Sequence, residues 1–180
     1  MPTWICLLRA VNLGSRNKVN MPALRQMLTD AGFHEVRTYV QSGNVVLRTP
    51  MRSPRKVAEA VRTVVAEHFG VDTPVLVRTA DELAAVVAWN PFPDESATQP
   101  QKVYVVHLDA DPDPAHVETL LTQDWQPDQV AVQGRDIVIA YGEGLHKSRL
   151  ERSAALRQLT ADATARNWRT LQACLDLARS

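Results

Sequence analysis

The sequence predicts an α+β protein made of two ferredoxin-like βαββαβ(α) repeats, with predominantly antiparallel sheets and helices packed on them. Two observations favour this class. Short β-prone runs alternate with segments whose apolar residues recur at helical spacing, and the same order of elements occurs twice along the 180 residues. Landmarks of the two halves are also separated by one interval, as expected for a repeat. Hydrophobic residues make up 45% of the chain, which is enough to form a core.

The first half has the order βαββαβ, followed by a further helix. The predicted strands are residues 4–11, 36–41, 44–48 and 74–78. Ser42-Gly43 separates the middle two strands and has the length of a tight hairpin turn. The helix signals are Asn20 before Pro22, Ser53 before Pro54, and Thr79 followed by Glu82, which has the spacing of a capping box.

The segment 90–101 contains three prolines and is predicted to be an irregular connection between residues 1–89, the first half, and residues 102–180, the second half. The second half repeats the order of elements. Its predicted strands and helices are a strand at 103–108, a helix through Val117, Leu120 and Leu121, strands at 129–132 and 137–141, and a helix containing Leu150, Leu156 and Leu159.

The interval between the halves predicts the C-terminal elements. Gly43 and Gly134 are 91 positions apart, and so are the pairs Arg78-Thr79 and Arg169-Thr170. The interval predicts a last strand at 166–168 and a final helix that Thr170 caps, carrying Leu171, Cys174, Leu175 and Ala178. Propensity alone also allows one continuous helix over 164–178.

Charge and cysteine content exclude several classes. Twenty basic residues balance twenty acidic ones, so no overall field attracts nucleic acid or an anionic membrane. Cys6 and Cys174 stand far apart, without the spacing of a disulfide framework or a metal site, and no cofactor motif is present. The chain has no signal sequence and no run of the ~20 apolar residues that span a bilayer, so we expect a cytoplasmic protein without metal or cofactor.

Arg, Asn and Ser gather at predicted strand ends and turns, as a carboxylate or phosphate site requires. The candidate ligand-binding residues are Arg9, Asn12, Arg16, Lys18, Gln41, Ser42, Asn44 and Arg166. Alternation places Arg9 on the strand face of Ile5 and Leu7, where a guanidinium needs an anionic partner. The competing interpretation is that the amides only shape turns, and that the arginines pair with acids such as Glu35 or Asp136.

Three functions remain open from these residues. The leading hypothesis is a non-catalytic binder of a small anionic ligand that carries a phosphate or carboxylate. A second is RNA or DNA binding through local basic loops, which the net charge does not favour. A third is an enzyme of unrecognised mechanism, although no nucleophile elbow or phosphate loop occurs and the five histidines are scattered. Oligomeric state stays open.

Several motifs in order carry a resemblance to a known family. These are Leu7-Leu8-Arg9-Ala10-Val11-Asn12, Arg16-Asn17-Lys18, Tyr39-Val40-Gln41-Ser42-Gly43-Asn44-Val45, Asn90-Pro91-Phe92-Pro93 and Ala165-Arg166-Asn167-Trp168-Arg169-Thr170. With them the chain strongly resembles the bacterial family called domain of unknown function 1697, over nearly its whole length. The resemblance implies an α+β, cytoplasmic bacterial protein and transfers no catalytic residues. One departure is Gly144-Leu145-His146-Lys147-Ser148-Arg149, where relatives have a Gly-Arg-Ser-Lys segment; this weakens a phosphate site at that loop.

Overall fold

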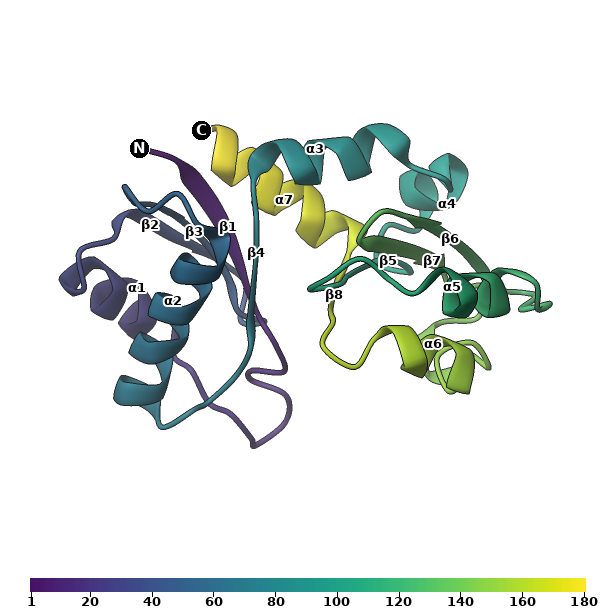
Figure 1. Cartoon of the computed structure of the whole chain (residues 1–180), viewed down its shortest axis with the longest axis horizontal. Helices are drawn as coiled ribbons and strands as arrows, with labels where there is room; N and C mark the ends of the chain where they lie inside the picture. The colour runs from purple at the N-terminus through teal and green to yellow at the C-terminus, as the bar shows by residue number, and fades with distance from the viewer. The chain divides into compact units, whose positions relative to one another are not determined.

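The structure, a computed structural model, describes all residues from 1 to 180 (Figure 1). The elements of the first half are β1 (Thr3–Leu8), α1 (Met21–Asp30), β2 (His34–Tyr39), β3 (Asn44–Arg48), α2 (Pro54–Phe69), β4 (Val75–Arg78) and α3 (Ala80–Trp89). Those of the second half are α4 (Pro93–Thr98), β5 (Val103–His107), α5 (Pro114–Leu121), β6 (Gln129–Gln133), β7 (Asp136–Ala140), the 3-10 turn η1 (Leu145–Lys147), α6 (Ala154–Leu159), β8 (Thr164–Asn167) and α7 (Trp168–Arg179).

The strands form two four-stranded antiparallel sheets with the same internal order. The first is β2-β3-β1-β4 and the second is β6-β7-β5-β8. In each sheet the first strand of the repeat lies between the third and the fourth, as in ferredoxin-like βαββαβ units. The predicted fold class, an α+β protein with two such repeats, is therefore confirmed.

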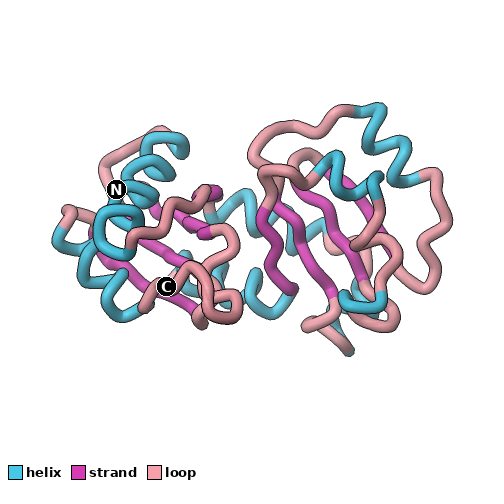
Figure 2. The backbone as a smooth tube through the Cα atoms, turned by 90° about the horizontal axis from the view of Figure 1, so that it is seen from below, coloured by secondary structure: helices cyan, strands magenta, loops and turns pink.

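The chain divides into two compact units. The first consists of Met1–Ala85 together with Gln172–Ser180, and the second of Val86–Leu171. The expected connecting segment 90–101 lies inside the second unit. Within each unit the strands (magenta in Figure 2) lie side by side with helices (cyan) along them.

The core of the first unit lies between α1, α2 and one face of its sheet. Alternation along β1 places Trp4, Cys6 and Leu8 in this core, and all three are buried. The helices contribute residues at helical spacing: Leu24, Leu28, Val57, Val61 and Val65. The predicted helix starts are confirmed, because Asn20 Oδ1 accepts from the N–H of Ala23 and Ser53 Oγ accepts from the N–H of Lys56.

The core of the second unit lies between α5, α6 and its sheet. Its larger members are Leu120, Trp125, Ile137, Ile139, Leu150 and Leu156. The prediction that Leu150 belongs to the same helix as Leu156 is wrong. Ser153 Oγ accepts from the N–H of Leu156 and so starts α6 three residues after Leu150, which is buried in a turn.

The segment expected to be irregular contains a helix, α4. Pro93 occupies its first turn, where a missing N–H breaks no hydrogen bond, and Asp94 and Glu95 follow at the positive end of the helix. The prolines of 90–101 were interpreted as helix breakers, whereas Pro93 is a helix starter. Residues of this segment consequently line a cavity of the second unit.

The C-terminal prediction of a strand followed by a helix is confirmed, and the continuous helix over 164–178 is wrong. The predicted boundaries of both elements lay too far toward the C-terminus. The strand is β8, and Asn167, not Thr170, caps α7, since Asn167 Oδ1 accepts from the N–H of Thr170 at 2.9 Å. Strand pairing shows why the interval of 91 failed here. Arg78 lies opposite Ile5 and Arg166 opposite Val105, so the arginines at corresponding places are 88 positions apart.

Two further predictions in the first unit are corrected. The hairpin after β2 is not a two-residue turn, because Tyr39 pairs with Asn44 and leaves a connection of residues 40–43. Gly43 and Val40 have positive φ there. Arg9 does not lie on the strand with Ile5, since β1 ends at Leu8, and its side chain is only half-buried.

None of the helices is both long and apolar enough to cross a bilayer.

Candidate functional site

The polar loop between β1 and α1 is held in shape by Asn12. Its Nδ2 donates to the carbonyl of Val19 at 2.8 Å and to that of Gln41 at 2.7 Å, while its Oδ1 accepts from the N–H of Val19. Asn17 Nδ2 donates to the carbonyl of Ala10, and Ala10, Asn12 and Asn17 all have positive φ. Small polar side chains tolerate this conformation and satisfy the backbone groups that it leaves open. Asn12 and Asn17 therefore shape the loop.

The neighbouring hairpin contacts this loop through Gly43. Its carbonyl accepts from the N–H of Leu8 at 2.8 Å. A Cβ at Gly43 would lie 2.6 Å from Val11 Cγ2 and 2.7 Å from Leu8 Cβ, so only glycine fits. The buried Asn44 donates from Nδ2 to the carbonyl of Tyr39 and to Ser42 Oγ. Asn44 and Ser42 thus contribute hydrogen bonds to the turn, as the competing interpretation expected.

Three of the predicted cations have no acidic partner. The side chains of Arg9, Arg16 and Lys18 form neither ion pairs nor hydrogen bonds. Segments 9–20 and 39–44 contain no Asp, Glu, His or Cys. The loop therefore carries three positive charges without a carboxylate, in a chain whose net charge is zero. Its side chains can donate hydrogen bonds to an anion, but they offer no carboxylate, imidazole or thiol as a base.

A cavity of about 400 Å³ lies beside this loop, lined by Asn12, Lys18, Val19, Asn20 and Gln41. The wall includes Asn20, the N-cap of α1, and the first turn of α1 contains no acidic residue. Asn20 accepts one N–H of this helix end, but no acidic side chain compensates the positive end of the α1 dipole. The structure brings Asn12, Lys18 and Gln41 together at this cavity. Arg9, Arg16, Ser42 and Asn44 belong to the same two segments but do not line it.

Arg166 lies in the second unit, on β8. It is buried, and its guanidinium donates to Thr164 Oγ1 and to the carbonyl of Ala165, both at 2.8 Å. Arg78 occupies the corresponding position of the first sheet and donates to the carbonyl of Val77. The two buried arginines are thus a feature of the repeat. The sequence interval of 91 did not match Arg78 with Arg166.

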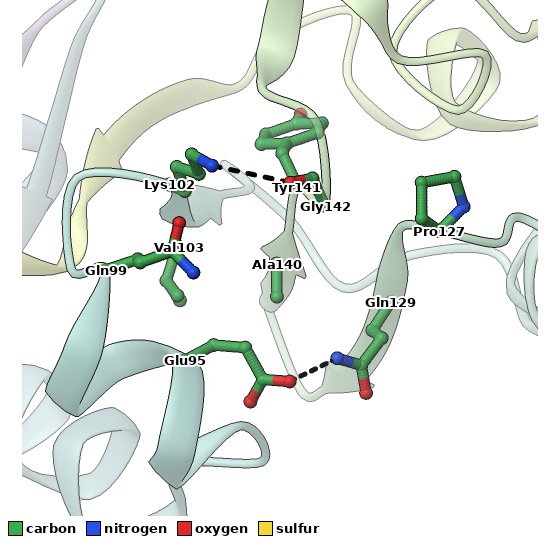
Figure 3. A pocket seen from close by; sticks show the side chains of 9 residues that line it. All are labelled: Glu95, Gln99, Lys102, Val103, Pro127, Gln129, Ala140, Tyr141 and Gly142. Carbon is green, nitrogen blue, oxygen red and sulfur yellow. Dashed lines mark hydrogen bonds between the residues drawn. The ribbon is translucent and has the colours of Figure 1, made fainter.

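A second cavity, which no sequence pattern predicted, lies in the second unit where β5 and β6 begin and β7 ends (Figure 3). It has a volume of about 210 Å³. The residues that line it are Glu95, Gln99, Lys102, Val103, Pro127, Gln129, Ala140, Tyr141 and Gly142. They come from three separate segments, and one of those was expected to be an irregular connection.

A buried carboxylate holds the wall of this second cavity. Asp128 accepts from the N–H of Gly142 at 3.0 Å through Oδ1 and from Ser148 Oγ at 2.7 Å through Oδ2. Ser148 Oγ in turn accepts from the N–H of Glu151. Tyr141 donates its hydroxyl proton to Glu151, and burial, followed by this carboxylate, raises the pKa of Tyr141. These hydrogen bonds fix the loop after β7.

Comparisons with known proteins identify a family of unknown function and a solved structure with the same fold. A family model described as a protein of unknown function (DUF1697) matches residues 1–137. A solved structure, that of the conserved bacterial protein SP0830 from Streptococcus pneumoniae, superposes with a TM-score of 0.78 at 20% identity. The match covers 100% of this chain and 99% of that one, so the whole fold is shared. No curated protein matches the chain.

Proposed function

This chain belongs to the DUF1697 family of proteins of unknown function, and from that premise we propose that it binds a small anionic ligand, phosphate-bearing or carboxylate-bearing, at the loop between β1 and α1. The observation that supports this function best is the trio of cations Arg9, Arg16 and Lys18 without an acidic partner. The cavity beside the loop supplies the space, and Lys18 lines it. The role is binding, since the donors there have no base among them.

The groups of the loop divide into two kinds. Asn12 uses its side-chain amide on backbone groups and fixes the wall, so its replacement would disturb the loop itself. Lys18 and Gln41 make no side-chain hydrogen bond and can turn their donors to an anion. An ammonium group and an amide beside a helix start are the donors that phosphate sites use. Lys18 is therefore the residue to test.

The test is a thermal-shift titration at low salt with inorganic phosphate, pyrophosphate, nucleoside phosphates and small dicarboxylates. A ligand at about 100 times its Kd stabilises by about 2.7 kcal/mol, which raises Tm by roughly 5–10 °C in a chain of this size. We expect one of these anions to give such a rise, and we expect Lys18→Ala to abolish it. Raising the salt concentration should weaken the effect.

Lys56→Ala is the matched control, because Lys56 is an exposed lysine of α2 in the same unit and its side chain has no partner. It removes the same charge away from the loop and should leave the shift unchanged. The proposal fails if no anion stabilises the protein, or if Lys18→Ala responds as Lys56→Ala does. Binding of oligonucleotides alone, with affinity falling steeply as salt rises, would replace it with nucleic-acid binding.

A further inference from the structure

Two opposite charges line the cavity of the second unit without neutralising each other. Glu95, on α4, accepts at Oε1 from Gln129 Nε2 at 2.5 Å. Lys102, just before β5, donates from Nζ to the carbonyl of Gly142 at 3.4 Å. Figure 3 shows the two hydrogen bonds on different sides of the cavity, with Val103 and Ala140 between them in this view. No ion pair joins Glu95 to Lys102 or to another side chain.

Each of these charges is held by a neutral group. The Gln129 amide donates to Glu95, and Lys102 donates to the carbonyl of Gly142 over 3.4 Å, so both charges have neutral partners and stay uncompensated. Both side chains are half-buried, where solvation by water is incomplete and a counter-charge is worth more than on the open surface. A small ligand that carries both an ammonium group and a carboxylate would compensate both charges.

The volume and the floor of the cavity limit the size of that ligand. About 210 Å³ is less than the roughly 300–1,000 Å³ of sites for drug-sized molecules, so the space suits a small metabolite. Val103 and Ala140 are buried at 0% and 4% exposure and form an apolar floor together with Pro127. Such a floor accommodates a short apolar side chain beside the two charged groups.

The wall around Gly142 is rigid before any ligand arrives. A Cβ at Gly142 would lie 2.7 Å from both Cβ and the carbonyl oxygen of Pro127, so the backbone approaches as closely as only glycine allows. The buried Asp128 fixes the same residue through its N–H. The carbonyl to which Lys102 donates is therefore held in place, which reduces the ordering that binding would require.

We propose that this cavity binds a free α-amino acid, with the ammonium group at Glu95 and the carboxylate at Lys102. This site is independent of the anion site of the first unit. It uses side chains from α4 and from the strand ends of the second sheet, and it gives the segment 90–101 a role in binding.

The experiment is isothermal titration calorimetry of the full chain with each of the standard amino acids. At least one should bind saturably. Its N-acetyl derivative lacks the ammonium group and its methyl ester lacks the carboxylate, so each should bind about tenfold more weakly or worse. Glu95→Gln and Lys102→Met should weaken binding of the free amino acid by a similar factor. Far-UV circular dichroism and Tm verify that these variants fold.

Matched controls remove the same charges elsewhere in the second unit. Glu118→Gln on α5 and Arg157→Gln on α6 change exposed residues outside the cavity and should leave binding unchanged. Lys18→Ala should also leave it unchanged, which separates this site from the anion site. The proposal is overturned if no amino acid binds at millimolar concentration, if binding survives both cavity variants, or if the derivatives bind as well as the free amino acid. The derivatives decide the question even where a variant unfolds.

Discussion

At the scale of single residues, Gly43 and Gly134 show how differently two hairpin glycines can be constrained. Both have positive φ, at +77° and +54°. Gly43 is also enclosed by Val11 and Leu8, whereas nothing lies within 4 Å of a Cβ placed at Gly134. Sequence alone treated them as equivalent landmarks, since the close approach of loop and hairpin exists only in the folded unit.

We expect Gly43→Ala to destabilise the protein more than Gly134→Ala. The left-handed backbone costs an alanine about 1–2 kcal/mol at either site. At Gly43 overpacking against Val11 and Leu8 adds about 1–3 kcal/mol. Urea unfolding of both variants measures the difference. Equal losses for the two would show that the loop and the hairpin do not approach as closely as the structure has them.

Residue by residue, the candidate anion site was predicted only in part. Asn12, Lys18 and Gln41 line the cavity, as the clustering of donors suggested. The amide of Asn12 donates to backbone carbonyls, and the amide of Asn44 donates to the carbonyl of Tyr39 and to Ser42 Oγ. Composition cannot separate these roles, because the same amide satisfies a turn or a ligand equally well. An amide stabilises a turn when the fold places a backbone carbonyl within hydrogen-bond distance of it, and only the folded structure shows this.

At the scale of elements, the C-terminal helix tests the corrected boundary. Asn167 ends β8 and caps α7, so strand pairing and helix capping meet at one residue. The N–H of Thr170 donates its hydrogen bond to Oδ1 of the Asn167 side chain. The interval between the repeats predicted Thr170 as the cap, because it assumed equal loop lengths in the two halves.

Asn167→Ala should lower the free energy of unfolding by about 1 kcal/mol, the usual loss for an N-cap. Asn167→Asp keeps a carboxylate oxygen as acceptor at the start of the helix and should stay within a few tenths of a kcal/mol of the original. Chemical denaturation of the two variants provides the comparison. An alanine variant with unchanged stability would indicate that Asn167 is not the N-cap of α7 and would favour Thr170.

At the scale of the whole molecule, burial of weak acids makes stability depend on pH at the alkaline end. Burial raises the pKa of Cys6 from 9.0 to about 12, and it raises that of Tyr141 as well. In the unfolded chain these groups lose their protons near pH 9 and 10, while the folded chain retains them. The unfolded state is then favoured progressively as the pH rises above about 9.

The free energy of unfolding should therefore be independent of these two groups below about pH 8 and fall above pH 9, by up to about 1.4 kcal/mol per pH unit for each. Urea titrations between pH 7 and 11 measure this slope. Cys6→Ala leaves a small cavity and lowers stability at every pH, but it should make the alkaline slope shallower. The same slope with and without the Cys6 thiol would contradict the expected burial effect.

At this scale the net charge does not reveal how the charged residues are distributed. The net charge of zero excludes a general attraction to polyanions, yet one loop carries three cations and no acid. In the second unit the charges of Glu95 and Lys102 cancel in the net charge, but the two side chains form no ion pair with each other. A formal charge therefore says little about either cavity.

The sequence by itself determined the order and type of the strands and helices, the two repeats and most helix starts, because hydrophobic period, turn residues and caps act over a few neighbouring positions. Tertiary structure alone decided the register that makes Arg78 and Arg166 correspond, and the cavity that Glu95 and Lys102 line. These features depend on which distant segments the sheets bring together. Strand pairing fixes those contacts. The register of the pairing depends on residues far apart in the sequence, so it is set only when the whole unit folds.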